Sequence, residues 1–344
     1  MAGDGEARDE HRGRLGGIRP RLSRSTRPEA PAQAPGDATA PAVDVVEDNG
    51  LRWINIERPR LAERDWLAEH FDFHPLAFED LVSRNQRPKV DVYDDYLFII
   101  LYFPSYEKAT GRLKAVELDI FVGPDYVISI PNDRFVPLSR LFARVADNEE
   151  ARRELFAYGS GYLLYRIVDE AVDAGFPMLR QMGGKLEDVE DGLFEGRSRE
   201  LVRDISNIKS EIINFRRIVR PQRAVYRDLE RAVSRYRAPD LDLYFDDITD
   251  ASERIWDVLE NYKEQVESLE STNESVISHR VNDVLRVLTI FSVLILPLTF
   301  VASLWGMNVE VPFAEHDLGF WILAGIMAGV LGATIAVFHR RGLL

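Results

Sequence analysis

Two long runs of apolar residues lie near the C-terminus of the chain. The first extends from Val287 to Leu304 and the second from Phe320 to Phe338, and neither contains a charged side chain. Each is about as long as the ~20 apolar residues that an α-helix needs to cross a bilayer. We therefore predict two transmembrane helices joined by a short loop. Because two helices cannot enclose a pore alone, the pattern also predicts an oligomer.

A seven-residue apolar repeat leads into the first run. Neither Gly nor Pro occurs between residues 241 and 296, and the repeat consists of Ile248, Ile255, Tyr262, Leu269 and Val276. This spacing is typical of a helix that packs along partner helices. It predicts one helix over 242–304, roughly 95 Å long at about 1.5 Å per residue. Two shorter helices joined by a polar turn at 271–273 are the alternative.

Residues 50–150 carry the mixed pattern of an α/β domain. Alternating, β-branched and aromatic runs predict strands over 51–56, 96–103, 116–122 and 126–130. Gly123-Pro124-Asp125, between the last two, predicts a hairpin. Helical patterns lie near 61–70, 75–83 and 135–146.

From about residue 155 onward the pattern is helical. An apolar face covers residues 163–171, and a second helix is expected over about 198–235. We expect Pro221 to interrupt this helix, because proline removes a backbone donor and its ring clashes with the preceding turn.

The composition narrows the function classes. The chain has 344 residues, no cysteine and a formal charge of −14. The lack of cysteine excludes disulfides and thiolate metal sites. The negative charge favours attraction of cations, and we expect no nucleic acid as a partner of the main body.

Charges beside the apolar runs predict the orientation. Arg280 and Arg286 precede the first run, and His339, Arg340 and Arg341 follow the second. The connecting loop carries Glu310, Glu315 and Asp317 and no Lys or Arg. By the positive-inside rule we expect a multi-pass protein of the cell membrane, with both termini in the cytoplasm and the loop outside. Residues 1–40 contain no apolar core, so we expect no signal peptide.

These patterns divide the chain into segments. They are a disordered N-terminal extension (1–48), a cytoplasmic α/β domain (49–155), a cytoplasmic helical hairpin (156–240), a long stalk and pore helix that includes the first span (241–305), an outer loop (306–319), a second span (320–339) and a basic tail (340–344). The extension carries six arginines and no acid between Arg12 and Arg27. We interpret this run as a solvated tail, with contact to anionic lipid or nucleic acid as the alternative.

Small hydroxyl side chains and leucines share one face of the first span. The stripe consists of Asn282, Leu285, Leu288, Thr289, Ser292, Leu296, Thr299 and Ser303. It is explained either by a helix–helix seam, in which each hydroxyl bonds to its own backbone, or by the lining of a central pore. The acid-rich approach and the acidic outer loop favour the pore. A lining without charge would pass a hydrated ion, with leucine rings as constrictions that dewet, which suits Mg²⁺ because that ion loses its water reluctantly.

Several motifs in order along the chain resemble those of the CorA family of divalent-cation transporters. They are Phe73 to Asp80 (FHPLAFED), Gln86 to Val90 (QRPKV), Asn282 to Thr289 (NDVLRVLT), Leu296 to Phe300 (LPLTF), Gly306-Met307-Asn308 and the basic end at 340–344. The resemblance covers roughly residues 50–344. It implies an α+β cytoplasmic domain plus a long pore helix and two C-terminal transmembrane helices, assembled as a funnel-shaped homopentamer in the bilayer.

The resemblance also implies a function and its residues. Passive, channel-like uptake of hydrated Mg²⁺ would pass a selectivity filter made of Gly306, Met307 and Asn308. Asn308 would ring the outer mouth or cap the helix, Gly306 would allow a sharp turn, and Met307 would pack to hold the loop. Cytoplasmic Mg²⁺ bound between subunits by Glu79, Asp80 and Asp247 would close the pore. Mg²⁺ is then both cargo and regulator, and no organic cofactor is expected.

The identity of the ion stays open at this point. Val309 follows Asn308 where magnesium-type members commonly have an aromatic residue, and His316 in the loop offers a softer ligand. A zinc transporter of the ZntB-like branch is therefore an alternative to a magnesium transporter that also carries Co²⁺ or Ni²⁺. A membrane-tethered sensor or scaffold is a more remote alternative. We do not expect an enzyme, because the chain has no phosphate-binding loop, no HExxH motif and no nucleophile beside His74.

Overall fold

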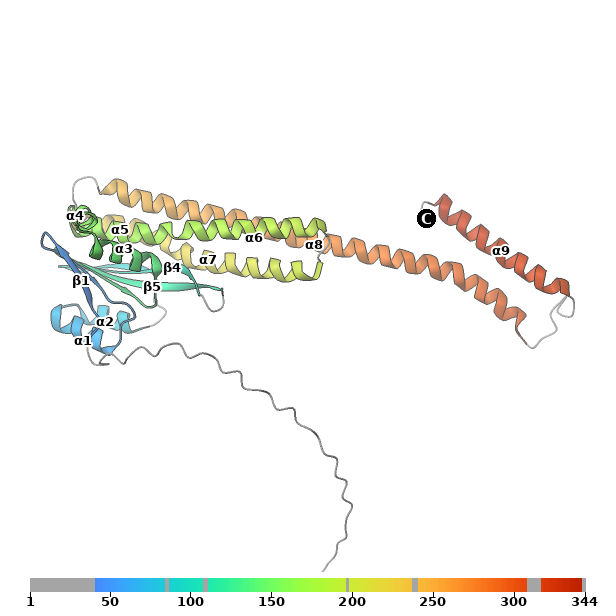
Figure 1. Cartoon of the computed structure of the whole chain (residues 1–344), viewed down its shortest axis with the longest axis horizontal. Helices are drawn as coiled ribbons and strands as arrows, with labels where there is room; N and C mark the ends of the chain where they lie inside the picture. Colours follow the sequence, from blue (N-terminus) through green and yellow to red (C-terminus); the bar gives the residue numbers. More distant parts are fainter. Residues whose placement is uncertain are drawn as a thin grey trace, which may run out of the picture. The chain divides into compact units, whose positions relative to one another are not determined.

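A six-stranded sheet organises the N-terminal part of the protein in the computed structural model, which describes residues 41–83, 87–107, 111–195, 198–236, 241–307 and 317–341 (Figure 1). The strands are β1 (Asp44–Asp48), β2 (Leu51–Asn55), β3 (Lys89–Val92), β4 (Leu97–Tyr106), β5 (Leu113–Val122) and β6 (Tyr126–Pro131). Their order across the sheet is β1-β2-β6-β5-β4-β3. Only the β2–β6 pair is parallel among these strands, so the sheet is mixed.

The first hairpin corrects the boundary that the sequence assigns to the N-terminal extension. β1 lies inside the range 1–48, and it pairs in register with β2 from Asp44↔Asn55 to Asp48↔Leu51. The two residues between them, Asn49 and Gly50, both have positive φ (50° and 78°). Asn-Gly is the preferred pair for the two-residue turn whose twist matches antiparallel strands. The hairpin expected at 123–125 is confirmed by the pairing of Val122 with Val127.

Side chains alternate between two cores, one on each face of the sheet. Leu97, Ile99 and Leu101 belong to one cluster, whereas Phe98 and Ile100 belong to the other. This near-continuous apolar run on β4 is what a strand covered on both faces requires. The element predictions at 51–56, 96–103, 116–122 and 126–130 are confirmed to within a few residues, and β1 and β3 were not predicted.

Different helices cover the two faces (Figure 1). On one face α1 (Leu61–His70) and α2 (Pro75–Val82) pack through Leu67, Ala77 and Leu81. On the other face lie α3 (Val136–Asp147), α4 (Glu149–Phe156) and α5 (Gly159–Asp173). α2 and α5 are therefore separated by the sheet. This separation decides how the predicted cation ligands are arranged.

Three long helices form the rest of the folded body. α6 (Gly175–Glu195), α7 (Ser198–Val233) and α8 (Asp242–Trp305) contact one another, and a short 3-10 turn, η1 (Ser234–Tyr236), follows α7. The last helix is α9 (Asp317–Arg340). The segment 156–240 therefore holds α5 as well as the hairpin of α6 and α7.

The predicted interruption of α7 at Pro221 is wrong, because the helix continues through that residue. Ile218, Val219 and Val225 on either side are buried against the core. Burial of several such side chains, at about 1.5–3 kcal/mol each, outweighs the ~3 kcal/mol that an internal proline costs.

The long helix predicted over 242–304 is confirmed as α8, which has 64 residues and passes through Pro297. The two-helix alternative with a turn at 271–273 is wrong. Ile248 and Ile255 of the repeat are buried, and Tyr262 and Leu269 pack against the same core. The repeat thus keeps one face of α8 on α6 and α7 for most of its length before the apolar run begins.

Candidate cation pathway and cation-binding residues

Two helices of the described chain are long and apolar enough to cross a membrane, α8 through its C-terminal part and α9. In both, the most apolar window is 0% buried. The exposed large side chains include Leu285, Leu288 and Leu296, which are 51%, 60% and 70% exposed. A continuous apolar surface of this kind marks contact with lipid or with other protein.

Three hydroxyls of the predicted stripe donate hydrogen bonds within their own helix. Thr289 Oγ1 donates to the Leu285 carbonyl at 2.7 Å, Ser292 Oγ to that of Leu288 at 2.8 Å, and Thr299 Oγ1 to that of Ile295 at 2.9 Å. Each hydroxyl therefore uses its one proton within the helix and keeps its lone pairs as acceptors. Asn282 and Ser303, at the two ends of the stripe, are exposed as well.

Gly306 ends α8, but not for the conformational reason that the sequence indicates. Its φ is −85° and its N–H donates to the Ala302 carbonyl at 3.1 Å. That backbone conformation is open to any residue, and an added Cβ would lie 3.5 Å from the Ala302 oxygen, an ordinary contact. Met307 is 55% exposed, and the loop residues that it was expected to hold lie outside the described residues, so this role stays a prediction.

The remaining predicted residues of the outer mouth fall outside what the structure describes. Asn308, Glu310 and Glu315 belong to the undescribed range 308–316. Asp317 is the first residue of α9, and its side chain is not described.

The predicted regulatory ligands lie on opposite sides of the sheet. Glu79 and Asp80 are on α2, whereas Asp247 is an exposed residue on the second turn of α8, close enough to α5 to influence the ionisation of Asp169 there. Among the described residues, no group of three or more His, Asp or Glu side chains within one chain could hold a metal ion. One subunit alone does not bring these acids together.

The two acids of α2 differ in their surroundings. Glu79 is exposed, while Asp80 accepts a hydrogen bond from Lys89 Nζ at 2.6 Å. His74 precedes both and caps the helix, since its Nδ1 accepts from the Leu76 N–H at 3.2 Å and Pro75 occupies the first turn. His74 therefore has a structural role at the turn that begins α2.

Asp169 is a candidate cation-binding residue that the sequence did not predict. Burial raises the pKa of its carboxyl to about 6; the neighbouring Arg166, 2.5 Å away, opposes this rise, and the nearby Asp173 and Asp247 add to it. A perturbed acid beside another acid is typical of a cation site. In the sequence, Asp169 directly follows the apolar pair Ile167-Val168, so it lies at the border of the apolar face over residues 163–171. This position is the signal that could have identified it.

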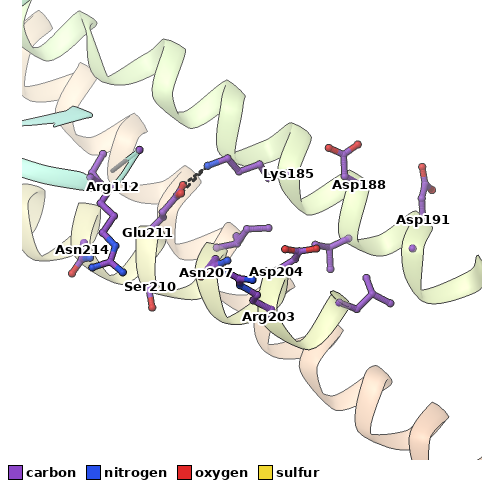
Figure 2. Close-up of a pocket in the computed structure, with 16 residues that line it drawn as sticks. Arg112, Lys185, Asp188, Asp191, Arg203, Asp204, Asn207, Ser210, Glu211 and Asn214 are labelled. Atoms are coloured by element: carbon purple, nitrogen blue, oxygen red, sulfur yellow. Dashed lines mark hydrogen bonds and ion pairs between the residues drawn. The ribbon is translucent and has the colours of Figure 1, made fainter. Parts of the chain in front are cut away.

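A large polar cavity lies between α6 and α7 (Figure 2). Its volume is about 1120 Å³, and its lining carries charges of both signs, among them Arg203, Asp188 and Asp204. Figure 2 shows Lys185 of α6 reaching Glu211 of α7, with its Nζ 2.7 Å from both carboxylate oxygens. The cavity belongs to the folded body and is formed apart from the stripe on α8.

The protein has an α+β body from which the long helix α8 extends. The C-terminal part of α8 and the helix α9 are the two apolar helices. Residues 48–340 match the protein family described as CorA-like Mg2+ transporter protein. The chain belongs to this family, whose members are membrane transporters of divalent cations and not enzymes.

Individual relatives agree with this assignment. The chain is 28% identical over 305 residues to the cobalt/magnesium transport protein CorA of Thermotoga maritima, covering 84% of this chain and 82% of that protein. The complete structure of the CorA magnesium transporter from Methanocaldococcus jannaschii superimposes with a TM-score of 0.77 at 22% identity, over 87% of this chain and 93% of that one. The ZntB cytoplasmic domain from Vibrio parahaemolyticus gives 0.55 at 17% identity, over 67% of this chain and 88% of that domain.

Proposed function

We propose that this chain carries hydrated Mg²⁺ passively into the cell along an axis lined by α8 from five copies. The observation that carries the proposal is that the stripe on α8, which includes Thr289, Ser292 and Thr299, is exposed and carries no charge. The name of the Thermotoga maritima relative, a cobalt/magnesium transport protein, supports magnesium as cargo with cobalt as a second ion.

The stripe fits a hydrated ion better than a bare one. Water molecules around a cation direct their hydrogens outward, so they need acceptors, and the hydroxyl lone pairs supply them. A lining without carboxylates does not bind a divalent ion tightly, and this permits rapid exit. The exposed Leu285, Leu288 and Leu296 would then form apolar rings that close by losing water. A membrane potential that is negative inside would drive entry, since each unit charge gains about 2.3 kcal/mol per 100 mV.

The outer mouth would select the ion. Asn308, held by Gly306 and Met307, would present carbonyl oxygens to the hydration shell. Acids of the loop, Glu310, Glu315 and Asp317, would concentrate cations before the mouth. In this proposal the loop lies outside and both termini lie in the cytoplasm, as the positive-inside rule predicts.

Cytoplasmic Mg²⁺ would close the pore by joining neighbouring subunits. Glu79 and Asp80 of one subunit would face Asp247 and Asp169 of the next, because within one chain these acids lie on different faces of the sheet. Oxygen ligands of this kind suit Mg²⁺. When the ion is scarce, repulsion between the facing carboxylates would loosen the contact and open the pore.

Zinc transport is the second candidate. Val309 after Asn308 and His316 in the loop favour it, because imidazole is a ligand that suits zinc.

The deciding experiment is ion flux into liposomes that contain the purified full chain. We expect Mg²⁺ uptake that raised internal Mg²⁺ suppresses, and we expect Asn308→Ala to abolish it. Competition between external Mg²⁺ and Zn²⁺ distinguishes the two candidates. Absence of flux for either ion would leave only the sensor or scaffold interpretation.

A further inference from the structure

Lys89, at the start of the edge strand β3, neutralises a carboxylate that the proposed gating needs. Its Nζ lies 2.6 Å from Asp80 Oδ2 and 2.5 Å from Asp91 Oδ2. The side chains of Lys89 and Asp80 are 32% and 19% exposed, so the pair is partly shielded from solvent. Burial lowers the pKa of the Lys89 amine, but the two acids outweigh this effect and hold the pKa above its ordinary value. Asp80 therefore already has a cation, supplied by its own chain.

A further acid lies in the same row of the sheet. Lys89 pairs with Ile100 of β4, and Ile100 pairs with Asp119 of β5, so the three side chains project from one face. Asp119 is 5% exposed, and its Oδ1 has no hydrogen-bond partner within the described residues. Burial raises the pKa of Asp119 well above its ordinary value, with Glu117 and Asp80 adding to the rise and Lys89 opposing it. An ammonium group released from Asp80 would thus still have Asp91 beside it and Asp119 along the row.

We propose that Lys89 is an internal competitor for the regulatory cation: its ammonium group occupies the Asp80 carboxylate that a divalent ion must bind. The inference deepens the proposed function and rests on the gating role given there to Asp80. If an ion binds only when the Asp80 carboxylate is free, its apparent dissociation constant is the intrinsic one divided by the fraction of time that the carboxylate is free. Lys89 therefore raises the Mg²⁺ concentration at which the pore closes. Glu79, which is exposed on the same helix, has no such lysine partner among the described residues.

The test compares Mg²⁺ binding by variants of the full chain in detergent. Binding is read as the rise in the thermal midpoint with Mg²⁺ concentration, because an ion that binds only the folded state stabilises it. We expect Lys89→Gln to lower the half-saturating Mg²⁺ concentration about three- to tenfold, the range that a partly exposed ion pair supports. Lys89→Arg, which keeps the charge, should stay near the wild-type value.

A matched control is available on the same sheet. Lys114 pairs with Asp133, and its side chain is 35% exposed, close to the 32% of Lys89. Lys114→Gln removes the same charge away from α2 and should leave the half-saturating concentration unchanged. An unchanged or higher concentration in Lys89→Gln, or a wild-type protein that Mg²⁺ does not stabilise, would overturn the inference.

The double variant separates competition from a general effect of charge. In an Asp80→Asn background the carboxylate is gone, so Lys89→Gln should no longer tighten Mg²⁺ binding. If it tightens binding there as well, the competition is refuted.

Liposome flux then distinguishes the inference from the proposed function. Tighter Mg²⁺ binding by Lys89→Gln, together with wild-type flux that internal Mg²⁺ does not suppress, would refute the gating and leave the competition standing. Suppressed wild-type flux with no change in Mg²⁺ affinity in Lys89→Gln would overturn the competition alone.

Discussion

Gln222 of α7 pairs with the backbone of Tyr102 on β4 as a neighbouring strand would. Its Oε1 accepts the Tyr102 N–H at 2.9 Å, and its Nε2 donates to the Tyr102 carbonyl oxygen. β3 pairs with β4 only over residues 97–100, so the edge of β4 beyond that point is covered by α7. Gln222 is 2% exposed, and it joins the sheet to the helical part of the body.

Replacing this side chain should destabilise the folded body. Gln222→Leu keeps the volume but removes the two hydrogen bonds that Gln222 makes to the partly buried N–H and carbonyl of Tyr102, which costs about 2–4 kcal/mol. Denaturant unfolding of the full chain in detergent measures the loss. Gln181→Leu, at an exposed position on α6, is the control and should change stability little. Equal stability of the two variants would contradict the role of Gln222.

Glu63 predicts a pH dependence of stability. Its side chain accepts hydrogen bonds from the backbone N–H groups of Ala42 and Arg60, and from the Arg60 guanidinium at 2.7 Å. Burial raises the pKa of this carboxyl, but these hydrogen bonds outweigh it and lower the pKa from 4.5 to about 2. Since the folded state favours the charged form, the stabilisation is complete above about pH 4.5 and is lost as the pH falls toward 2.

The matching variant is Glu63→Gln. At pH 7 we expect it to lower the free energy of unfolding by about 2 kcal/mol, and the difference from wild type should shrink as the pH falls below 4.5. Unfolding curves at pH 7, 5 and 3 test this. Glu69→Gln on the exposed face of α1 should show no such trend. A difference that persists unchanged at pH 3 would show that the charge of Glu63 is not the cause.

The hydroxyl stripe predicts that two threonines in the apolar helices behave differently. Thr299 on α8 and Thr334 on α9 both donate to their own backbone, at 2.9 and 2.8 Å. Valine removes the hydroxyl and keeps the shape. Only Thr299→Val should slow Mg²⁺ flux, by on the order of tenfold for one lost acceptor worth about 1.4 kcal/mol. Equal flux in the two variants would place the axis elsewhere.

The proposed role of Asp247 predicts that its replacement changes the closure of the pore by Mg²⁺ but not the flux through the open pore. We expect Asp247→Asn to raise the internal Mg²⁺ concentration needed for half-closure about tenfold, because one charged oxygen ligand is lost. Flux at low internal Mg²⁺ should stay near the wild-type value. Asp257→Asn, an exposed acid further along the same helix, is the control and should leave the threshold unchanged. Gating that is unaffected by Asp247→Asn would remove this residue from the regulatory site.

The local sequence pattern was sufficient to predict the helices and strands with strong periodicity. The apolar runs of α8 and α9 and the seven-residue repeat of α8 are properties of neighbouring residues, so they are visible without any knowledge of the fold. The same holds for β4, β5 and β6, whose β-branched and aromatic residues fill both cores. β1 was missed because three of its five residues are acidic, so that it carries little apolar pattern. β3 was missed because four residues at a sheet edge carry too little pattern.

Contacts between distant segments were decided only by the tertiary structure. The continuity of α7 at Pro221 depends on burial against helices that are remote in sequence. The pairing of Lys89 with Asp80 depends on α2 lying over β3, and the closeness of Asp169 to Asp247 depends on α5 lying against α8. By itself, the sequence determined the two spans, the long helix and the stripe along it, because helical periodicity is local. The arrangement of the acids is set by packing across the sheet, which no single stretch of the chain encodes.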